Sequence, residues 1–185
     1  MSTQAWRRAL VLGGIRSGKS EHAEALVADQ LSVRYVATAR RGDGDAEWAA
    51  RIEAHRARRP TGWTTDEVGE DPFALLDLLV AADPADALLV EDLGTWVGAV
   101  SEAVSLEPGG RGLTAVAERL AAAVQACPAR LVLVSPEVGL SVVPATESGR
   151  HFADALGTTN RAVAGVCDRV VLVIAGYAVP VKGAL

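Results

Sequence analysis

Short apolar runs alternate with longer stretches of helical periodicity along most of the chain. The runs have the length of strands, and the last four are rich in valine, leucine and isoleucine, as strands buried on both faces of a sheet should be. They span residues 8–12, 33–38, 87–91, 130–135 and 169–175. Because this alternation is typical of βαβ units, we expect an α/β fold with a mainly parallel sheet and helices on both faces.

Helical periodicity and capping residues predict five helices between these strands. They span residues 19–31, 46–59, 71–82, 113–127 and 148–166. Asp71 and Pro72 supply an N-cap followed by a proline at the first helical position. Gly157 lies inside the last predicted helix and leaves its continuity open. The stretch 102–112 contains Pro-Gly-Gly and is typical of a surface loop.

Size and composition favour one compact enzyme domain over residues 1–185. Half of the residues are hydrophobic, which is enough for a substantial core, and the net charge of -5 argues against nucleic acid as a main partner. Cys127 and Cys167 lack metal-ligand spacing and are expected to be reduced, packed thiols. The chain shows neither a secretory signal nor an apolar run of the roughly 18 residues that span a membrane. We therefore expect a soluble, cytoplasmic protein.

The first apolar run leads directly into the phosphate-binding loop pattern G-x-x-x-x-G-K-[ST]. In this pattern the glycines let backbone N–H groups turn toward an anion, Lys19 reaches the outer phosphates, and Ser20 ligates the magnesium that a nucleotide carries. Arg16 adds a further cation. The sequence therefore predicts chemistry on a nucleoside triphosphate with Mg²⁺. The nucleotide-binding residues predicted from the loop are Gly13, Gly14, Ile15, Arg16, Ser17, Gly18, Lys19 and Ser20.

An acid at the end of a neighbouring strand is the usual second part of such a site. Glu91 and Asp92 close one of the apolar runs and are the best candidate pair. Two interpretations stay open, since these acids either organise magnesium and substrate or only cap the strand. The segment 136–140 also follows a predicted strand, and it is either a substrate loop or a simple glycine turn.

A histidine stands among arginines on the predicted helix 46–59. Trp48, Ile52 and His55 fall at i, i+4 and i+7 and so share one face of that helix. Arg59 lies one turn away, and such cations disfavour the protonated imidazole. A neutral imidazole is a nucleophile, and the arginines would gather a triphosphate around it. A solvated or packed histidine is the alternative interpretation.

Together these motifs resemble the bifunctional adenosylcobinamide kinase/adenosylcobinamide-phosphate guanylyltransferase family of cobalamin biosynthesis. The family's G-G-x-R-S-G-K-S loop stands at residues 13–20, its Y-[IV]-A-T strand at 35–38 and its R-I-x-x-H-[RK]-x-x-R-P helix at 51–60. Its acid-closed strand with a downstream tryptophan is similar to residues 89–96, and its E-V-G loop to residues 137–144. The resemblance covers most of the chain.

The resemblance implies a two-step enzyme with a RecA-like P-loop NTPase fold and a homotrimeric assembly. Such an enzyme phosphorylates the aminopropanol hydroxyl of adenosylcobinamide with ATP or GTP. It then transfers GMP from GTP to that phosphate through a covalent guanylyl-histidine, giving adenosylcobinamide-GDP. The family's histidine falls on His55, with Lys19 as the second catalytic residue and Ser20 as the ligand of Mg²⁺. The nucleotide contacts that the resemblance adds to the loop are Thr38, Ala39, Arg40, Arg56, Arg59, Glu67 and Glu91.

The chain departs from the family pattern at several positions. Pro136 stands where the family usually has asparagine, and Asp92 and Gly94 stand where members often have cysteine and threonine. These departures concern the substrate loop more than the nucleotide chemistry, because the phosphate loop, the histidine and the strand acid are retained. A single-activity small-molecule kinase with a phosphate loop is the alternative, and it would make His55 incidental.

Overall fold

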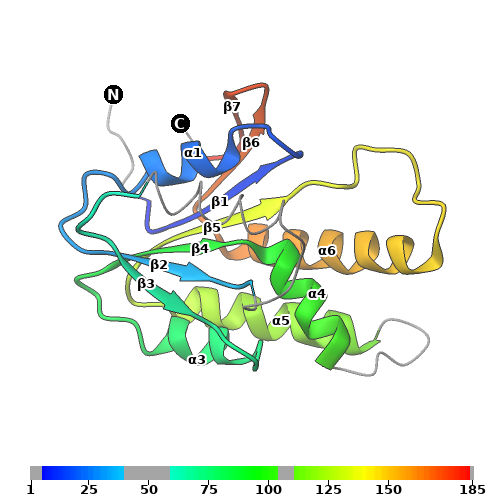
Figure 1. Cartoon of the computed structure of the whole chain (residues 1–185), viewed down its shortest axis with the longest axis horizontal. Coiled ribbons are helices and arrows are strands. Elements are labelled where there is room, and N and C mark those ends of the chain that lie inside the picture. Colours follow the sequence, from blue (N-terminus) through cyan, green and yellow to red (C-terminus); the bar gives the residue numbers. More distant parts are fainter. Residues whose placement is uncertain (1–5, 40–58, 104–110, 184–185) are drawn as a thin grey trace.

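The computed structural model describes residues 6–39, 59–103 and 111–183, and their strands form one seven-stranded sheet (Figure 1). The order across the sheet is β3-β2-β4-β5-β1-β6-β7. Neighbouring strands run parallel, except that β7 is antiparallel to β6, so the prediction of a mainly parallel sheet is confirmed. The strands are β1 (Arg8–Gly13), β2 (Val33–Ala37), β3 (Thr64–Glu67), β4 (Ala87–Glu91), β5 (Arg130–Pro136), β6 (Arg169–Ile174) and β7 (Tyr177–Lys182).

Helices cover both faces of this sheet, as the sequence predicts. On one face α1 packs Ala23 into a cluster with Val11 and Val134. The helices α3 to α6 lie on the other face, and Figure 1 shows α1 opposite α3, α5 and α6. No helix in the described ranges is long and apolar enough to cross a membrane. The helices are α1 (Lys19–Ala25), α3 (Ala74–Val80), α4 (Leu93–Ala103), α5 (Arg111–Ala126) and α6 (Glu147–Val166).

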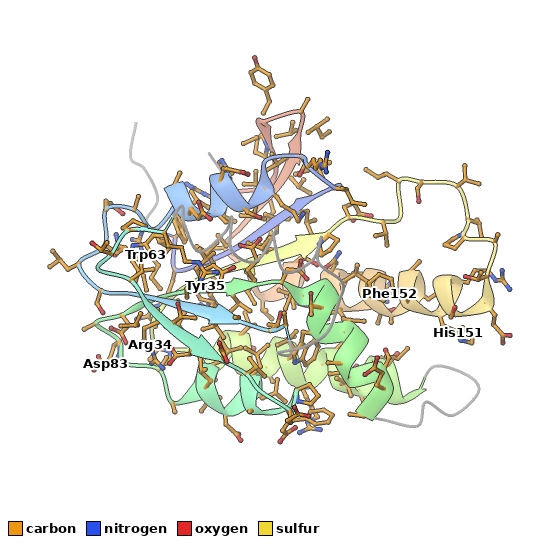
Figure 2. All side chains as sticks on the ribbon, viewed as in Figure 1. Arg34, Tyr35, Trp63, Asp83, His151 and Phe152 are labelled. Carbon is orange, nitrogen blue, oxygen red and sulfur yellow. The ribbon has the colours of Figure 1, made fainter. Side chains whose placement is uncertain are left out.

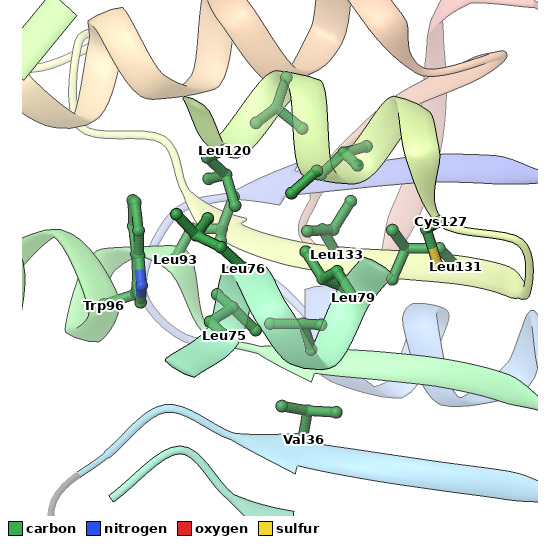
Figure 3. Packing of buried hydrophobic residues seen from close by; sticks show 14 of the residues in the cluster. Val36, Leu75, Leu76, Leu79, Leu93, Trp96, Leu120, Cys127, Leu131 and Leu133 are labelled. Atoms are coloured by element: carbon green, nitrogen blue, oxygen red, sulfur yellow. The ribbon is translucent and has the colours of Figure 1, made fainter. Parts of the chain in front are cut away.

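The central strands are apolar because both of their faces are covered. In β5, Leu131 and Leu133 join the cluster beneath α3 to α6, whereas Val132 joins the cluster beneath α1. This alternation follows from the two-residue period of a strand. Figure 3 shows Leu120 of α5 and the indole of Trp96 packed into the larger cluster. Each fully buried aliphatic side chain of this kind stabilises the fold by about 1.5–3 kcal/mol relative to an exposed one.

The five predicted strands are confirmed, and each end lies within one residue of its predicted position. The strand predicted to reach residue 175 stops at Ile174, because Ala175 (φ 50) and Gly176 (φ 84) turn the chain back into β7. The strands β3 and β7 were not predicted. β3 is short and polar, and β7 contains Pro180, which is typical of edge positions.

The first helix is shorter than the predicted range 19–31. It ends at Ala25, where the Leu26 N–H is shared between the carbonyl oxygens of His22 and Ala23, each at 3.2 Å. Hydrogen bonds spanning three residues then tighten the chain into turns. The apolar pattern continues past the helix because a tight turn, like a helix, keeps some side chains on the buried face.

Three other helices are confirmed with small shifts at their ends. The Asp71 side chain accepts a hydrogen bond from the Phe73 N–H at 2.9 Å, but α3 begins only at Ala74, so Pro72 lies in a turn before the helix. α5 and α6 begin two residues and one residue before their predicted starts. α6 continues through Gly157, which answers the question of its continuity.

The remaining predictions are the helix at 46–59 and the loop at 102–112. The helix predicted at 46–59 lies outside the described residues except for Arg59, which stands in a bend. The loop predicted at 102–112 was too long, because α4 and α5 occupy its two ends. α4 itself was missed, since Gly94 and Gly98 lower the helix propensity of that segment.

Candidate functional site

The described site residues gather at the carboxyl ends of the parallel strands. The strand register pairs Ala37 of β2 with Glu67 on β3 and with Glu91 on β4, so the two acids lie level on either side of β2. Gly13 ends β1 directly beside Pro136 of β5. This edge is where open α/β sheets bind their ligands.

The phosphate loop turns sharply between β1 and α1, in the strand–loop–helix context that the motif predicts. Arg16 (φ 56) and Gly18 (φ 90) both adopt left-handed backbone conformations. The Ser17 N–H donates to the Gly14 carbonyl at 3.3 Å. Successive N–H groups in such a turn form a concave surface that binds anions, and Lys19 follows as the first residue of α1.

Two loop glycines are required by close contacts with the β6–β7 region. A Cβ atom on Gly13 would lie 2.9 Å from the Val173 carbonyl oxygen and would collide with the Ser17 side chain. A Cβ atom on Gly18 would lie 3.3 Å from the Cα of Gly176. The Gly176 N–H also donates to the Ser17 carbonyl at 2.8 Å. The turn between β6 and β7 therefore packs against the phosphate loop and supports its conformation.

Glu91 is the acid that reaches the phosphate loop. Its Oε1 accepts a hydrogen bond from the Ser20 hydroxyl, and its Oε2 accepts one from the Tyr35 hydroxyl at 3.3 Å. Burial raises the pKa of Glu91, and the hydrogen bond from Ser20 and the charge of Lys19 oppose that rise. A partly buried carboxylate thus lies against the residue predicted to ligate magnesium.

Asp92, the second acid of the pair, caps a helix instead. Its Oδ1 accepts hydrogen bonds from the Thr95 N–H at 2.7 Å and the Thr95 hydroxyl at 3.1 Å, at the start of α4. The Asp92 carbonyl accepts from the Thr38 hydroxyl at 2.8 Å, and the Thr38 N–H donates to the Glu91 carbonyl at 3.1 Å. Asp92 therefore caps helix α4 rather than the strand, and the role of Glu91 in organising magnesium stays a prediction.

Arg59 joins the site through Tyr35, a residue that the sequence analysis did not select. The guanidinium carbon of Arg59 lies 3.2 Å from the centroid of the Tyr35 ring, and its Nη1 donates to the Thr65 hydroxyl at 3.2 Å. Figure 2 labels Tyr35 on β2. Burial, and then the charge of Glu91, raise the pKa of Tyr35, so its hydroxyl keeps its proton. The available signal was its place as the first residue of the Y-[IV]-A-T match at 35–38.

The predicted residues divide into those that the structure describes and those that it does not. His55, Arg40 and Arg56 lie outside the described residues. Ala39 is half-buried just after β2, and Glu67 is exposed at the end of β3. Contacts among described residues run from Arg59 through Tyr35 and Glu91 to Ser20 and link the end of the predicted helix 46–59 with the phosphate loop.

The donor set at this edge fits magnesium held largely by nucleotide phosphates. Mg²⁺ prefers oxygen ligands and is usually bound by one or two protein groups together with phosphates and water. The Ser20 hydroxyl and the neighbouring Glu91 carboxylate supply such oxygens. Within the described part of the chain, no group of three or more His, Cys, Asp or Glu side chains could hold a metal ion. This donor set therefore fits a cation that arrives with the nucleotide.

The segment after β5 is a long exposed loop rather than a simple glycine turn (Figure 1). It is anchored where it starts. The Glu137 N–H donates to the Gly13 carbonyl at 3.0 Å, and the Asn160 side chain donates to the Pro136 carbonyl at 3.0 Å. The buried Ser135 hydroxyl donates to the Asn160 Oδ1 at 2.6 Å. These contacts hold the loop entrance beside the first glycine of the phosphate loop.

Comparison with solved structures supports the fold. An ATPase described as "prototypical", from the type III secretion system of pathogenic bacteria, superposes with a TM-score of 0.55. The two sequences are 13% identical, and the alignment covers 90% of this chain and 50% of that chain. At this identity the likeness shows the fold alone, which is that of the P-loop ATPases.

Sequence comparisons show the family. The family described as "Cobinamide kinase / cobinamide phosphate guanyltransferase" matches residues 9–181. The "Bifunctional adenosylcobalamin biosynthesis protein CobU" of Salmonella typhimurium is 41% identical over 184 residues, covering 94% of this chain and 98% of that protein. The "Bifunctional adenosylcobalamin biosynthesis protein CobP" of Pseudomonas aeruginosa is 42% identical over 178 residues, covering 95% of this chain and 98% of that protein. The chain therefore belongs to the cobinamide kinase / cobinamide phosphate guanyltransferase family.

Proposed function

We propose that this chain phosphorylates adenosylcobinamide with ATP or GTP and then converts the phosphate to adenosylcobinamide-GDP with GMP from GTP. The observation that carries the proposal is the hydrogen bond between Ser20 of the phosphate loop and Glu91 at the end of β4. It places a triphosphate-binding loop and a strand acid together in a chain whose family match extends over residues 9–181. Membership of this family makes both reactions the expected pair.

In the kinase step the loop residues would stabilise charge on the transferring phosphoryl group. The loop N–H groups surround the phosphates, and Lys19 and Arg16 bring positive charge to the outer ones. The Ser20 hydroxyl would hold Mg²⁺, and Glu91 fixes the direction of that hydroxyl. When bound, Mg²⁺ neutralises charge that develops between the outer phosphates.

In the guanylyltransferase step His55 would act as the nucleophile. A ring nitrogen of His55 bonds to the α-phosphorus of GTP as the bond to the β-phosphate oxygen breaks, which releases pyrophosphate. An oxygen of adenosylcobinamide phosphate then attacks the same phosphorus, the phosphorus–nitrogen bond breaks, and the histidine is restored. In this proposal Arg56 and Arg59 pair with the phosphates, while Thr38, Ala39, Arg40, Glu67 and Glu91 contact the nucleotide.

The test is transfer of label from α-labelled GTP to the protein. We expect acid-labile label that survives denaturation in the wild type and is absent from His55→Ala, which would accumulate adenosylcobinamide phosphate detectable by mass. His151→Ala is the matched control, since His151 is exposed on α6 beside Glu147. An unlabelled wild type that still phosphorylates adenosylcobinamide would leave the single-activity kinase as the function.

We further propose that residues 1–185 form one catalytic domain, assembled as a cytoplasmic homotrimer. The placement of every described strand in one sheet supports a single domain. Cys127 and Cys167 are free and buried, and burial raises the pKa of Cys167 to about 12, which fits a reducing compartment. The trimer rests on the resemblance to the family, and sedimentation equilibrium of the purified protein tests it directly.

A further inference from the structure

Tyr35 lies between two parts of the proposed nucleotide site that belong to different elements. Its side chain is 3% exposed and packs in the cluster that contains Ala23 of α1. The ring stacks against Arg59 and the hydroxyl donates to Glu91, and Arg59 also interacts with that hydroxyl. A buried residue that contacts two partners can transmit the position of one partner to the other.

The ring holds Arg59. The guanidinium carbon of Arg59 lies 3.2 Å from the ring centroid, and Nη1 is fixed by the Thr65 hydroxyl at 3.2 Å. The Arg59 Nε is buried and has no hydrogen-bond partner among the residues that the structure describes. A planar cation stacked on an aromatic face and fixed at one nitrogen presents its remaining N–H groups in a constant direction.

The hydroxyl holds Glu91. Tyr35 donates to the Oε2 of Glu91 at 3.3 Å, while Ser20 donates to the Oε1. The two oxygens of one carboxylate thus accept from different elements, one from β2 and one from the phosphate loop. Loss of the Tyr35 hydroxyl removes one of the hydrogen bonds that orient this carboxylate, and the direction of the Ser20 hydroxyl would change with it.

We propose that Tyr35 is a positioning residue that couples Arg59 to Ser20. Its ring holds Arg59, and its hydroxyl positions Ser20 through the carboxylate of Glu91. The inference rests on the proposed function, in which Ser20 lies at the triphosphate and Arg59 follows the guanylylated His55 by four positions. In this proposal Tyr35 acts through Arg59 and Glu91 and not by direct contact with the nucleotide or the metal ion. It sets the relative placement of the groups that make that contact.

The test measures the dissociation constant of Mg²⁺-GTP by calorimetry, without turnover. Tyr35→Phe keeps the stacking and loses one hydrogen bond, so we expect about fivefold weaker binding. Tyr35→Leu also removes the aromatic face beneath Arg59, and we expect a further loss of about tenfold. Thermal unfolding of each variant checks that it is folded under the conditions of the binding measurement.

Double-mutant cycles separate the two contacts. The effects of Tyr35→Phe and Glu91→Ala should be less than additive, because each removes one partner of the same hydrogen bond. Tyr35→Leu and Arg59→Gln should likewise be less than additive, with a larger coupling energy than the pair Tyr35→Phe and Arg59→Gln, because only the leucine variant removes the stacked ring. If Tyr35 only supported the fold, Tyr35→Phe and Tyr35→Leu would show the same coupling energies with the Glu91 and Arg59 variants. If Tyr35→Leu does not fold, the cycles with Tyr35→Phe decide.

The control is Tyr177→Phe, which removes a hydroxyl from the other tyrosine of the chain, 80% exposed on β7. We expect its dissociation constant to stay within about twofold of the wild type. Wild-type binding by Tyr35→Phe, or additivity in every cycle, would overturn the coupling alone. A wild type that binds no Mg²⁺-GTP would overturn the proposed function and the coupling with it.

Discussion

Asp168 and Glu91 lie at opposite edges of the same sheet and hold their negative charges by different means. At the amino edge, before β6, one oxygen of Asp168 accepts hydrogen bonds from the backbone N–H groups of Arg7 and Arg8, each at 2.9 Å. Burial acts to raise the pKa of Asp168, but these bonds and the charge of Arg8 outweigh it and lower the pKa. Backbone donors that belong to the fold therefore stabilise this carboxylate.

Glu91, at the carboxyl edge, shows the opposite balance. Burial raises the pKa of its carboxyl group, and the side chains of Ser20 and Tyr35 donate hydrogen bonds to it. A carboxylate that is costly to bury in the free protein suits a site that a cation and a triphosphate complete. The comparison indicates that the charge of Asp168 stabilises the fold, whereas the buried charge of Glu91 costs stability.

Among the tests of this comparison between Asp168 and Glu91, we expect Glu91→Gln to have the largest effect. We expect turnover to fall roughly a hundredfold, because the carboxylate that orients Ser20 is lost. We also expect the free energy of unfolding of the nucleotide-free protein to rise at pH 7 by on the order of 1 kcal/mol. The assay compares steady-state rates with urea unfolding of the same samples.

The pH dependence of that gain follows from the raised pKa of Glu91. The native state disfavours the charged form of Glu91. The charged carboxylate therefore lowers the free energy of unfolding as pH rises from the unfolded-state pKa of about 4 through the higher native-state pKa. The gain in Glu91→Gln should therefore be present at pH 7 and nearly absent at pH 4. A variant that is less stable than the wild type at pH 7 would break the comparison.

The second prediction concerns two departures from the family pattern that are in contact at the carboxyl edge. A Cβ atom on Gly94 would lie 2.7 Å from the Cγ of Pro136, and a proline ring cannot rotate away. We expect Gly94→Thr to cost about 2 kcal/mol of unfolding free energy. Adding Pro136→Asn should recover much of that cost, as a urea-unfolding cycle measures. Simple additivity would show that the two positions vary independently.

The smallest effect is expected at the amino edge. Asp168→Asn should cost about 1 kcal/mol at pH 7, a figure reduced for solvent screening because the carboxylate is 41% exposed. The native pKa is lowered, so this stability is present above about pH 4 and lost as pH falls through the native pKa. Urea unfolding at pH 7 and pH 2.5 measures it. Loss of Mg²⁺-GTP binding in the folded variant would contradict a purely structural role.

The fold could be predicted where side-chain pattern and burial coincide. The apolar runs of β4, β5 and β6 are covered on both faces, and their ends were predicted to within a residue. α4 escaped prediction because its glycines weaken intrinsic propensity, and its tertiary contacts override that weakness. Trp96 is buried and donates to the Pro72 carbonyl at 2.7 Å, and Asp92 caps the first turn. An acid followed by apolar residues at helical spacing was the signal.

The site could be predicted where a local motif carries it, as in the phosphate loop. The partnership of Tyr35 with Glu91 could not, because it depends on β2 lying beside β4 in the sheet. Strand order is a long-range property that spacing along the chain does not encode. Glu91 and Asp92 looked equivalent in sequence because helix α4, which Asp92 caps, was not predicted.

The contact between Ser17 and Gly176 has a consequence for synthesis of the protein. The phosphate loop is among the first segments to leave the ribosome, yet its outer support comes from the turn between β6 and β7. Translation proceeds at about 5–20 residues per second, so the roughly 160 intervening residues take about 8 to 32 seconds to add. The nascent loop therefore has its nucleotide motif long before it has its supporting turn, and nucleotide binding should begin only after the last hairpin has formed.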